Sequence, residues 1–360
     1  MFRTKTRLFR LDFLVSVAAL LFLATLATPQ TIDPFENGWT LDAEGSELNF
    51  MSIKKGDVAE DSRFATLSGL ITEDGKAQIR VLMDSVDTHV DLRNVRMRFL
   101  FFESFKYPEA LITAQLDPAT LQDLHQTRRK MVEVPFTLDL HGVTVERSAE
   151  VAVALIDNDR VNVSTTKPIA LKLADFNLEE GRQKLQEAAE VTIVPVGMVS
   201  FDFVFNRSSP GTPVATAEVT RVAAGGGASA ALETKGAFDR EACIGRFEIL
   251  SRAGNIYFGA GSARLSAESV PLLENLYDVV SRCPDLKIEI AGHTDSDGSD
   301  AANLRLSELR AASVKEYLQG KGIPESRMLV VGYGEAQPLL ENTSAANKAR
   351  NRRIEFSALN

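Results

Sequence analysis

The stretch Gly292-His293-Thr294-Asp295, with Arg310 fifteen residues after the aspartate, organises the C-terminal part of this 360-residue chain. Residues 286–290 before it alternate apolar and polar side chains, as a half-buried strand does, and residues 292–298 have the composition of a loop. The helix expected after the loop ends near Gly320. Its expected apolar stripe consists of Leu306, Leu309, Ser313, Val314 and Tyr317. The pattern predicts a strand-loop-helix unit that carries one carboxylate and one guanidinium.

Two interpretations fit the spacing of Asp295 and Arg310. Arg310 falls beside the apolar stripe, where a charge is costly unless a carboxylate or a ligand compensates it. The two residues either form a structural ion pair or stay apart, so that Asp295 binds a ligand ammonium and Arg310 binds the carboxylate of the same ligand. The second arrangement would select a zwitterion.

Several motifs of this region resemble the C-terminal domain of outer-membrane protein A, and the resemblance covers roughly residues 240–360. The matching motifs are Gly292–Asp295, Asn303 with Leu306-Ser307 and Arg310-Ala311, Gly332-Tyr333-Gly334-Glu335 with Pro338, and Asn351-Arg352-Arg353-Ile354-Glu355. The resemblance implies an α/β two-layer sandwich that binds peptidoglycan without covalent attachment.

The resemblance also implies which residues bind the wall. Positions that match Asp295 and Arg310 hold the free amino-acid end of diaminopimelate in the peptide stem, which agrees with the zwitterion interpretation. Thr294, Asn303 and Arg353 lie in matching motifs and are further candidates. For Asn303 and Arg353, a helix cap or a pairing with a carboxylate explains the residue equally well.

The first residues of the chain have the pattern of an export signal. Four basic residues precede an uncharged run of about fifteen residues that ends at Ala27, too short for a membrane-spanning helix. We expect a cleaved signal at residues 1–27. Its removal takes away four basic residues and one acid, so the formal charge of −9 becomes −12. Because a chain with this negative charge repels phosphate groups, nucleic acid is not expected as a partner.

The two cysteines, Cys243 and Cys283, both lie in the C-terminal region. An oxidising compartment favours a disulfide between them, and two buried free thiols are the alternative. The four histidines lie far apart in the sequence and no cysteine pair has ligand spacing, so no metal site and no cofactor is predicted.

Residues 207–236 are rich in Ser, Pro, Gly, Ala and Thr and lack apolar periodicity, which indicates a flexible linker. The linker separates an N-terminal domain at residues 36–206 from a C-terminal domain at residues 237–360. After it we expect a short strand at residues 255–258, a helix at 266–283, strands at 286–290, 327–331 and 353–357, and a short helix at 345–349.

The N-terminal region shows repeated period-two alternation. Val199, Phe201, Phe203 and Phe205 share one face of a strand, and Phe136, Leu138 and Leu140 share a face of another. Such strands, with residues 91–102 as the one helical interruption, predict an antiparallel barrel or sandwich, and the region is long enough to close a barrel of eight or so strands. The N-terminal region contains one Trp, Trp39, and one Tyr, Tyr107. These are too few for the aromatic girdles of an outer-membrane barrel, which favours a barrel outside the membrane.

Short motifs of residues 36–206 resemble the YceI-like family of periplasmic, lipocalin-like barrels, some of which hold a polyisoprenoid chain. They include Trp39-Thr40-Leu41-Asp42, Ser85-Val86-Asp87, Gly142-Val143-Thr144 and Asp175-Phe176. An arginine often precedes the Asp-Phe step in the family, and here Leu173-Ala174 stand instead. Candidate residues for lining a lipid pocket are Phe50, Phe136, Phe201 and Phe203, and a solid barrel core is the alternative use of the same residues.

These features predict a non-catalytic envelope protein, in the periplasm or on the periplasmic face of the outer membrane of a Gram-negative cell. Peptidoglycan is the expected partner, and a lipid or polyisoprenoid is the expected ligand of the barrel. A purely structural wall tether and an envelope hydrolase are the alternatives. The hydrolase lacks support because the sequence has no Gly-x-Ser-x-Gly elbow, no metal cluster and no Cys-His pair outside the expected disulfide.

Overall fold

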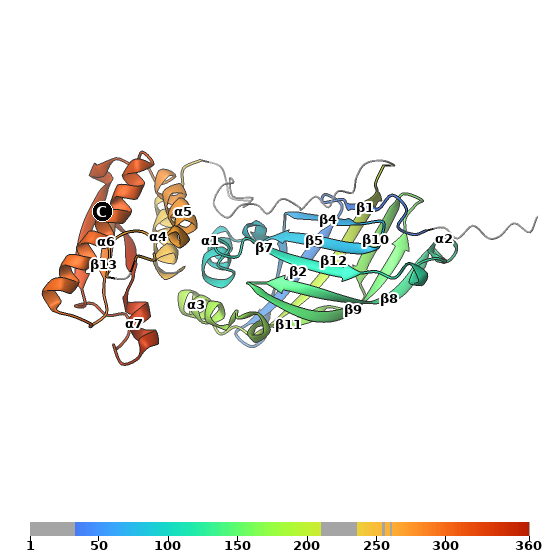
Figure 1. The fold of residues 1–360 in the computed structure, drawn as a ribbon, viewed down its shortest axis with the longest axis horizontal. Helices are drawn as coiled ribbons and strands as arrows, with labels where there is room; N and C mark the ends of the chain where they lie inside the picture. The colour runs from blue at the N-terminus through green and yellow to red at the C-terminus, as the bar shows by residue number, and fades with distance from the viewer. Residues whose placement is uncertain (1–32, 210–235, 254–255, 260, 360) are drawn as a thin grey trace, which may run out of the picture. The chain divides into compact units, whose positions relative to one another are not determined.

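The computed structural model describes residues 33–209, 236–253, 256–259 and 261–359. The predicted signal at 1–27 and most of the predicted linker at 207–236 lie outside these residues. Two folded parts are present, a β-barrel within residues 33–209 and an α/β domain within residues 236–359 (Figure 1). This confirms the fold class predicted from the sequence.

The barrel is a closed ring of eight antiparallel strands, because β12 pairs with β10 on one edge and with β1 on the other. In order around the ring, the strands are β1 (Trp39–Leu41), β4 (Leu67–Ile71), β5 (Lys76–Leu82), β7 (Glu109–Gln115), β8 (Arg129–Leu140), β9 (Val143–Leu155), β10 (Arg160–Thr165) and β12 (Val196–Arg207). Closure leaves no free strand edge in the ring.

Four further strands extend the sheet at the first half of β12. There β2 (Glu47–Lys54) follows β1 along one edge of β12, and β11 (Ile169–Lys172) follows β10 along the other. Strands β3 (Val58–Phe64) and β6 (Val86–Asp87) continue outward from β2. These four strands lie outside the closed ring of eight.

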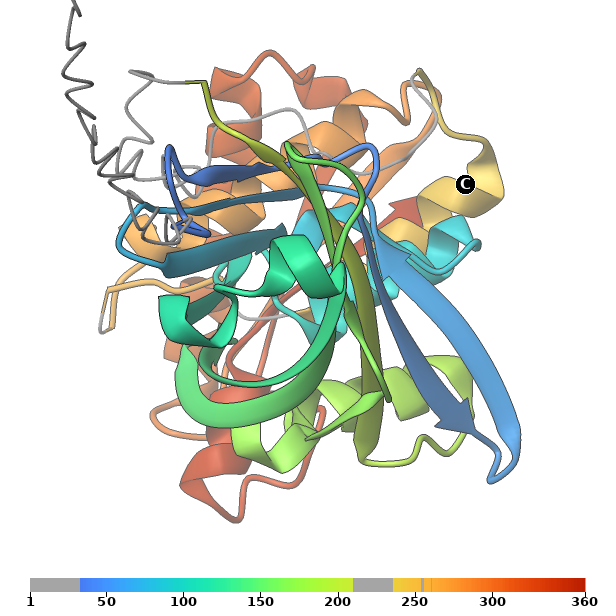
Figure 2. The same ribbon diagram turned by 90° about the vertical axis from the view of Figure 1, so that its right-hand side faces the viewer.

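Helices lie at both ends of the barrel. Helix α1 (Asp91–Arg96) continues into a π-helical turn, η2 (Met97–Phe101), which confirms the predicted helical interruption. In Figures 1 and 2, α1 and α3 (Glu179–Ala189) lie at one end and α2 (Leu124–Thr127) at the other. Short 3-10 turns occur at η1 (Met83–Ser85), η3 (Pro118–Thr120) and η4 (Leu173–Phe176).

Helix α3 was not predicted from the sequence. Glu179 and Glu180 form its first turn. Two carboxylates there interact favourably with the partial positive charge of a helix N-terminus. The helix buries Leu185 on one face, a short apolar pattern that polar neighbours conceal in the sequence.

The C-terminal domain packs helices against a three-stranded sheet. Strand β13 (Lys287–His293) lies between β14 (Met328–Gly334), to which it is parallel, and β15 (Ile354–Leu359), to which it is antiparallel. The helices are α4 (Arg240–Ala253), α5 (Val270–Ser281), α6 (Asp300–Gly320) and α7 (Ala345–Asn351), with 3-10 turns η5 (Ala267–Ser269) and η6 (Glu325–Arg327).

The segment before β13 differs from the prediction in two ways. Residues 256–258 form no strand, since Phe258 only makes an isolated bridge to Leu265. The segment before them, for which no helix was predicted, is α4, whose Ser251 hydroxyl bonds to the backbone of Phe356 in β15. The sheet therefore gains a helix on β15 instead of a further strand.

Helix α6 packs on β13 and β14 through small residues. A Cβ atom added at Gly292 would lie 2.1 Å from the Ser307 carbonyl oxygen, and one at Gly332 would lie 2.7 Å from Ser307 Oγ. The hydroxyl of Ser307 accepts a hydrogen bond from the Gly334 N–H at 2.9 Å. Only glycine on the strands permits this approach.

The predicted apolar stripe of α6 was wrong in part. The buried positions are Asn303, Ser307, Ala311, Val314 and Leu318, whereas Leu309 is 49% exposed. Close packing of α6 on the sheet requires small and polar residues at the buried positions. A prediction based only on apolar residues therefore places the buried face of the helix part of a turn away from its true position.

A disulfide joins Cys243 in α4 to Cys283 just after α5, which confirms the predicted pairing. The bond closes a loop with a sequence separation of 40. In the chain-entropy treatment a loop of this size stabilises the fold by about 3–4 kcal/mol. The bond also holds α4, which contacts β15, to the end of α5.

Reduction should therefore lower the melting temperature of the C-terminal domain by several degrees. Scanning calorimetry of the full chain, with and without reductant, measures this shift. A variant with Cys243→Ser and Cys283→Ser is the control and should not respond to reductant. Two thiols that alkylate in the unreduced, unfolded protein would show that no bond forms.

Candidate functional site

The loop between β13 and α6 is fixed at its start by two backbone hydrogen bonds and at its end by a side-chain cap. The Thr294 N–H donates to the Gly334 carbonyl at 2.9 Å, and the His293 N–H donates to the Arg353 carbonyl at 3.0 Å. The Ser299 hydroxyl caps α6 by accepting from the Ala302 N–H. The loop is thus held against the ends of β14 and β15.

Asp295 is a buried carboxylate in this loop, with 6% of the residue exposed. Its Oδ1 accepts a hydrogen bond from the Asp297 N–H at 3.0 Å, and its Oδ2 accepts one from Arg352 Nη1 at 2.5 Å. Its backbone carbonyl accepts a hydrogen bond from Asn303 Nδ2 at 3.1 Å. The side chain of Arg352 is 46% exposed, so a buried anion is neutralised by a cation that reaches in from the surface.

Arg310 lies on α6 and is half-buried. Its Nε donates to the Ser262 carbonyl at 3.1 Å, and its guanidinium carbon lies 5.1 Å from the centre of the Phe258 ring. Burial lowers the pKa of Arg310, the charge of Arg352 lowers it further, and Asp295 opposes the shift. Within the described residues, no hydrogen bond or ion pair uses its two terminal nitrogens.

The structure distinguishes the two interpretations of Asp295 and Arg310. No ion pair joins them within the described residues, and Asp295 pairs with Arg352 instead. A direct structural pair was therefore the wrong interpretation. Arg352 was not predicted as a site residue, although it precedes Arg353 in the motif Asn351–Glu355.

The three further candidates all lie near this loop. Asn303 is 5% exposed and also donates to Glu335 Oε2, a pairing with a carboxylate. Thr294 is 2% exposed, and its hydroxyl is buried without a hydrogen-bond partner. Arg353 is 8% exposed and donates to Glu355, to the Asn351 carbonyl and to the Gln337 carbonyl. Asn303 and Arg353 are thus tied into the protein by side-chain hydrogen bonds.

A second charged cluster lies behind the loop on β13 and β15. His293 Nε2 lies 3.6 Å from Glu355 Oε2, and Arg353 Nε lies 2.6 Å from Glu355 Oε1. His293 and Arg353 hold the pKa of Glu355 down at about 2, against the opposing effect of burial. The cluster joins β15 to the end of β13, next to Thr294.

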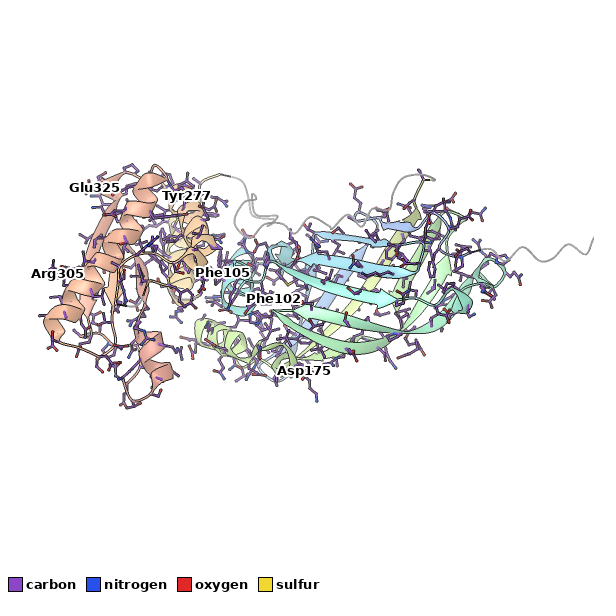
Figure 3. The ribbon with its side chains drawn as sticks, in the orientation of Figure 1. Phe102, Phe105, Asp175, Tyr277, Arg305 and Glu325 are labelled. Atoms are coloured by element: carbon purple, nitrogen blue, oxygen red, sulfur yellow. A yellow bond between two sulfur atoms is a disulfide. The ribbon has the colours of Figure 1, made fainter. Side chains whose placement is uncertain are left out.

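The barrel encloses a cavity of about 720 Å³, within the range of small-molecule pockets. Its walls are mostly apolar side chains from the strands and from α1 and α3. The four phenylalanines proposed from the sequence, Phe50, Phe136, Phe201 and Phe203, all line it. Phe102, labelled in Figure 3, lines the cavity near α1 and packs against Phe50 and Phe64.

Two family matches cover most of the folded chain. Residues 257–352 match the OmpA family, and residues 39–205 match the YceI-like domain. The chain thus contains a region that matches the YceI-like domain, followed by one that matches the OmpA family. Both resemblances predicted from the sequence are confirmed.

Individual relatives match one module each. The chain is 46% identical over 85 residues to outer membrane porin F of Pseudomonas fluorescens, which is 24% of this chain and 26% of that protein. It is 35% identical over 103 residues to the peptidoglycan-binding protein ArfA of Mycobacterium bovis, 29% of this chain and 32% of that protein. The chain thus spans about a quarter to a third of the length of these curated relatives.

A solved structure matches the barrel. It is a polyisoprenoid binding domain from Saccharophagus degradans, 36% identical, and the match covers 47% of this chain and 98% of that one with a TM-score of 0.46.

Two further features bear on the site. The described residues contain no group of three or more His, Cys, Asp or Glu placed to hold a metal ion. Among the helices of these residues, none has the length and apolar character to cross a membrane.

The lowered pKa of Glu355 predicts a pH-dependent stability difference. A carboxylate whose pKa is lowered in the folded protein stabilises the fold. This contribution is fully present at pH values above the ordinary pKa of 4.5 and is lost as the pH falls toward about 2. Glu355→Gln should therefore destabilise the C-terminal domain at pH 7, with a gap that narrows below about pH 5. Urea unfolding of both proteins between pH 7 and pH 3 measures the gap.

Glu316→Gln, an exposed change on α6, is the matched control and should leave stability unchanged at every pH. A gap for Glu355→Gln that stays constant down to pH 3 would contradict the assignment.

Proposed function

We propose that this chain is a non-catalytic envelope protein that binds peptidoglycan through its C-terminal domain and an apolar lipid or isoprenoid in its barrel. The observation that carries the proposal is the pair formed by buried Asp295 and half-buried Arg310, held on one strand-loop-helix unit without an ion pair between them. A carboxylate and a separate guanidinium on one rigid unit suit a ligand that carries both an ammonium and a carboxylate.

In the proposed complex, the ligand ammonium binds Asp295 and its carboxylate binds the terminal nitrogens of Arg310. The free end of diaminopimelate in a peptide stem has this chemistry. Arg352 occupies Oδ2 of Asp295 in the free protein, so the ligand ammonium displaces it or shares the carboxylate with it. Because Arg352 is partly exposed, it can move into solvent without leaving a buried charge.

The other candidate residues have supporting roles in this proposal. Thr294 offers the ligand a hydroxyl that has no partner among the described residues. Asn303 positions the backbone of Asp295, and Arg353 positions the end of β15. The match to the OmpA family and the similarity to the peptidoglycan-binding protein ArfA support wall binding.

The lipid part of the proposal rests on the cavity. Phe50, Phe136, Phe201 and Phe203 line a mostly apolar cavity, which suits a long hydrocarbon chain better than a polar molecule. The YceI-like match supports the same ligand class. A structural tether with a solid barrel is less favoured, because a solid core would leave no space of about 720 Å³.

The proposal includes the cellular setting. We place the protein in the periplasm or on the periplasmic face of the outer membrane of a Gram-negative cell, after export by a signal at residues 1–27. The domains span residues 36–206 and 237–360, joined by a linker at 207–236. An envelope hydrolase is the weaker candidate, because neither family match points to a catalytic site.

Removal of either charge should nearly abolish wall binding. Asp295→Asn and Arg310→Ala each leave a ligand charge desolvated and unpaired, at a cost of about 2–5 kcal/mol. Co-sedimentation of the full chain with diaminopimelate-type peptidoglycan measures the loss, and thermal melts check that the variants fold. Peptidoglycan with lysine in place of diaminopimelate lacks the second carboxylate and should bind weakly.

Arg305→Ala is the matched control. Arg305 lies on the same helix as Arg310 but is exposed on its outer side (Figure 3). This variant should bind as the unmodified protein does. Normal binding by folded Asp295→Asn and Arg310→Ala proteins would contradict the proposed site.

The protein purified from its native envelope should carry a lipid. Native mass spectrometry of the full chain should show a bound mass that solvent extraction releases. Asp295→Asn should retain the lipid while losing the wall, because the cavity lining lies wholly in the barrel. Protein with no extractable lipid, and no affinity for added long-chain alcohols, would contradict the proposed barrel function.

A further inference from the structure

The cavity lining is polar at both ends, and the two ends differ in charge. At the end with α1, the lining includes Lys54, Glu60, Arg93 and Arg96. At the end with α2, it includes Gln115, Asp117 and Thr120. The side chains at the α1 end are mainly cationic and those at the α2 end are acidic or neutral. A ligand with a charged head and an apolar tail would therefore have a preferred direction.

The cations at the α1 end outnumber the carboxylates that line the cavity there. Glu60 accepts a hydrogen bond from Lys54 across the β2–β3 hairpin and pairs with Arg93 Nη1 at 2.9 Å. One carboxylate thus serves two cations. Arg96, the third cation, forms no ion pair and no hydrogen bond with its side chain within the described residues.

Arg96 is placed to act on the contents of the cavity. It lies three residues after Arg93 on α1, so the two side chains lie on the same side of the helix, and both line the cavity. Its Nε is buried without a hydrogen-bond partner. A guanidinium beside an apolar space is unfavourable unless an anion compensates it, and it can bind a carboxylate or phosphate with two parallel hydrogen bonds.

We propose that the barrel selects lipids with an anionic head, a carboxylate or a phosphate, which Arg96 binds at the α1 end of the cavity with help from Arg93 and Lys54. The chain of the ligand then extends along the phenylalanines toward α2. This inference rests on the proposed lipid-binding function and adds the chemistry of the head group.

The test compares three probes of similar chain length on the full-length protein: hexadecanoate, hexadecyl phosphate and hexadecanol. Delipidated protein should bind at least one of the two anions about tenfold or more tightly than hexadecanol, as expected for charge-assisted hydrogen bonds. The preferred anion identifies the head as carboxylate or phosphate. Arg96→Gln should remove most of this preference while leaving the affinity for hexadecanol unchanged.

Arg129→Gln serves as the control, because Arg129 is an exposed arginine on β8 that does not line the cavity. It should keep the preference for the anion. Equal affinities of the unmodified protein for all three probes would overturn the head-group inference while leaving lipid binding intact. A preference that survives in Arg96→Gln, or an equal loss of hexadecanol binding in that variant, would also overturn it. No binding of any probe would overturn the lipid proposal and the inference together.

Discussion

The contact of Ser307 with Gly292 and Gly332 is the constraint on which the C-terminal domain depends. It brings the backbone of α6 so close to β13 and β14 that a Cβ atom at Gly292 or at Gly332 would collide with α6. The Ser307 hydroxyl adds a hydrogen bond to the backbone of β14. Because α6 is fixed in this way, the loop before it has one path. That path buries Asp295, which pairs with Arg352 and not with Arg310.

The barrel depends on a different constraint. Alternation along the strands directs apolar side chains inward, and the number of strands determines whether these side chains fill the interior or leave a cavity. Strand β12 supplies Val199, Phe201, Phe203 and Phe205 to one face, and all four line the cavity. Eight strands enclose more space than these side chains fill. Helix α1 adds Arg93 and Arg96 to the polar groups that line this space, beside Lys54 and Glu60 from the strands.

Periodicity in the sequence predicts the three strands of the C-terminal sheet and the alternating faces of β8 and β12, because a half-buried strand repeats every two residues regardless of its neighbours. The site loop is predictable as well, since glycine and polar residues interrupt the pattern at residues 292–298. Helix α3 was missed because it buries only Gly181 and Leu185 among charged residues, whereas α4 has a buried face at helical spacing that could have been recognised. The buried face of α6 was misplaced because close packing demanded Ser307 and Ala311 where a looser contact would use leucine.

The role of Arg352 depends on three-dimensional proximity and could not be read from the sequence. Fifty-seven residues separate it from Asp295, and only the pairing of β13 with β15 brings them together. A resident counter-ion at a binding carboxylate also affects kinetics. An arriving ammonium replaces one ion pair with another, so the net gain is smaller than for a bare carboxylate, and the departing ligand leaves behind an anion that Arg352 can neutralise at once. On the proposed function, the domain would exchange between sites on the wall, so that a mesh that is continually cut and extended could be followed without a permanent bond.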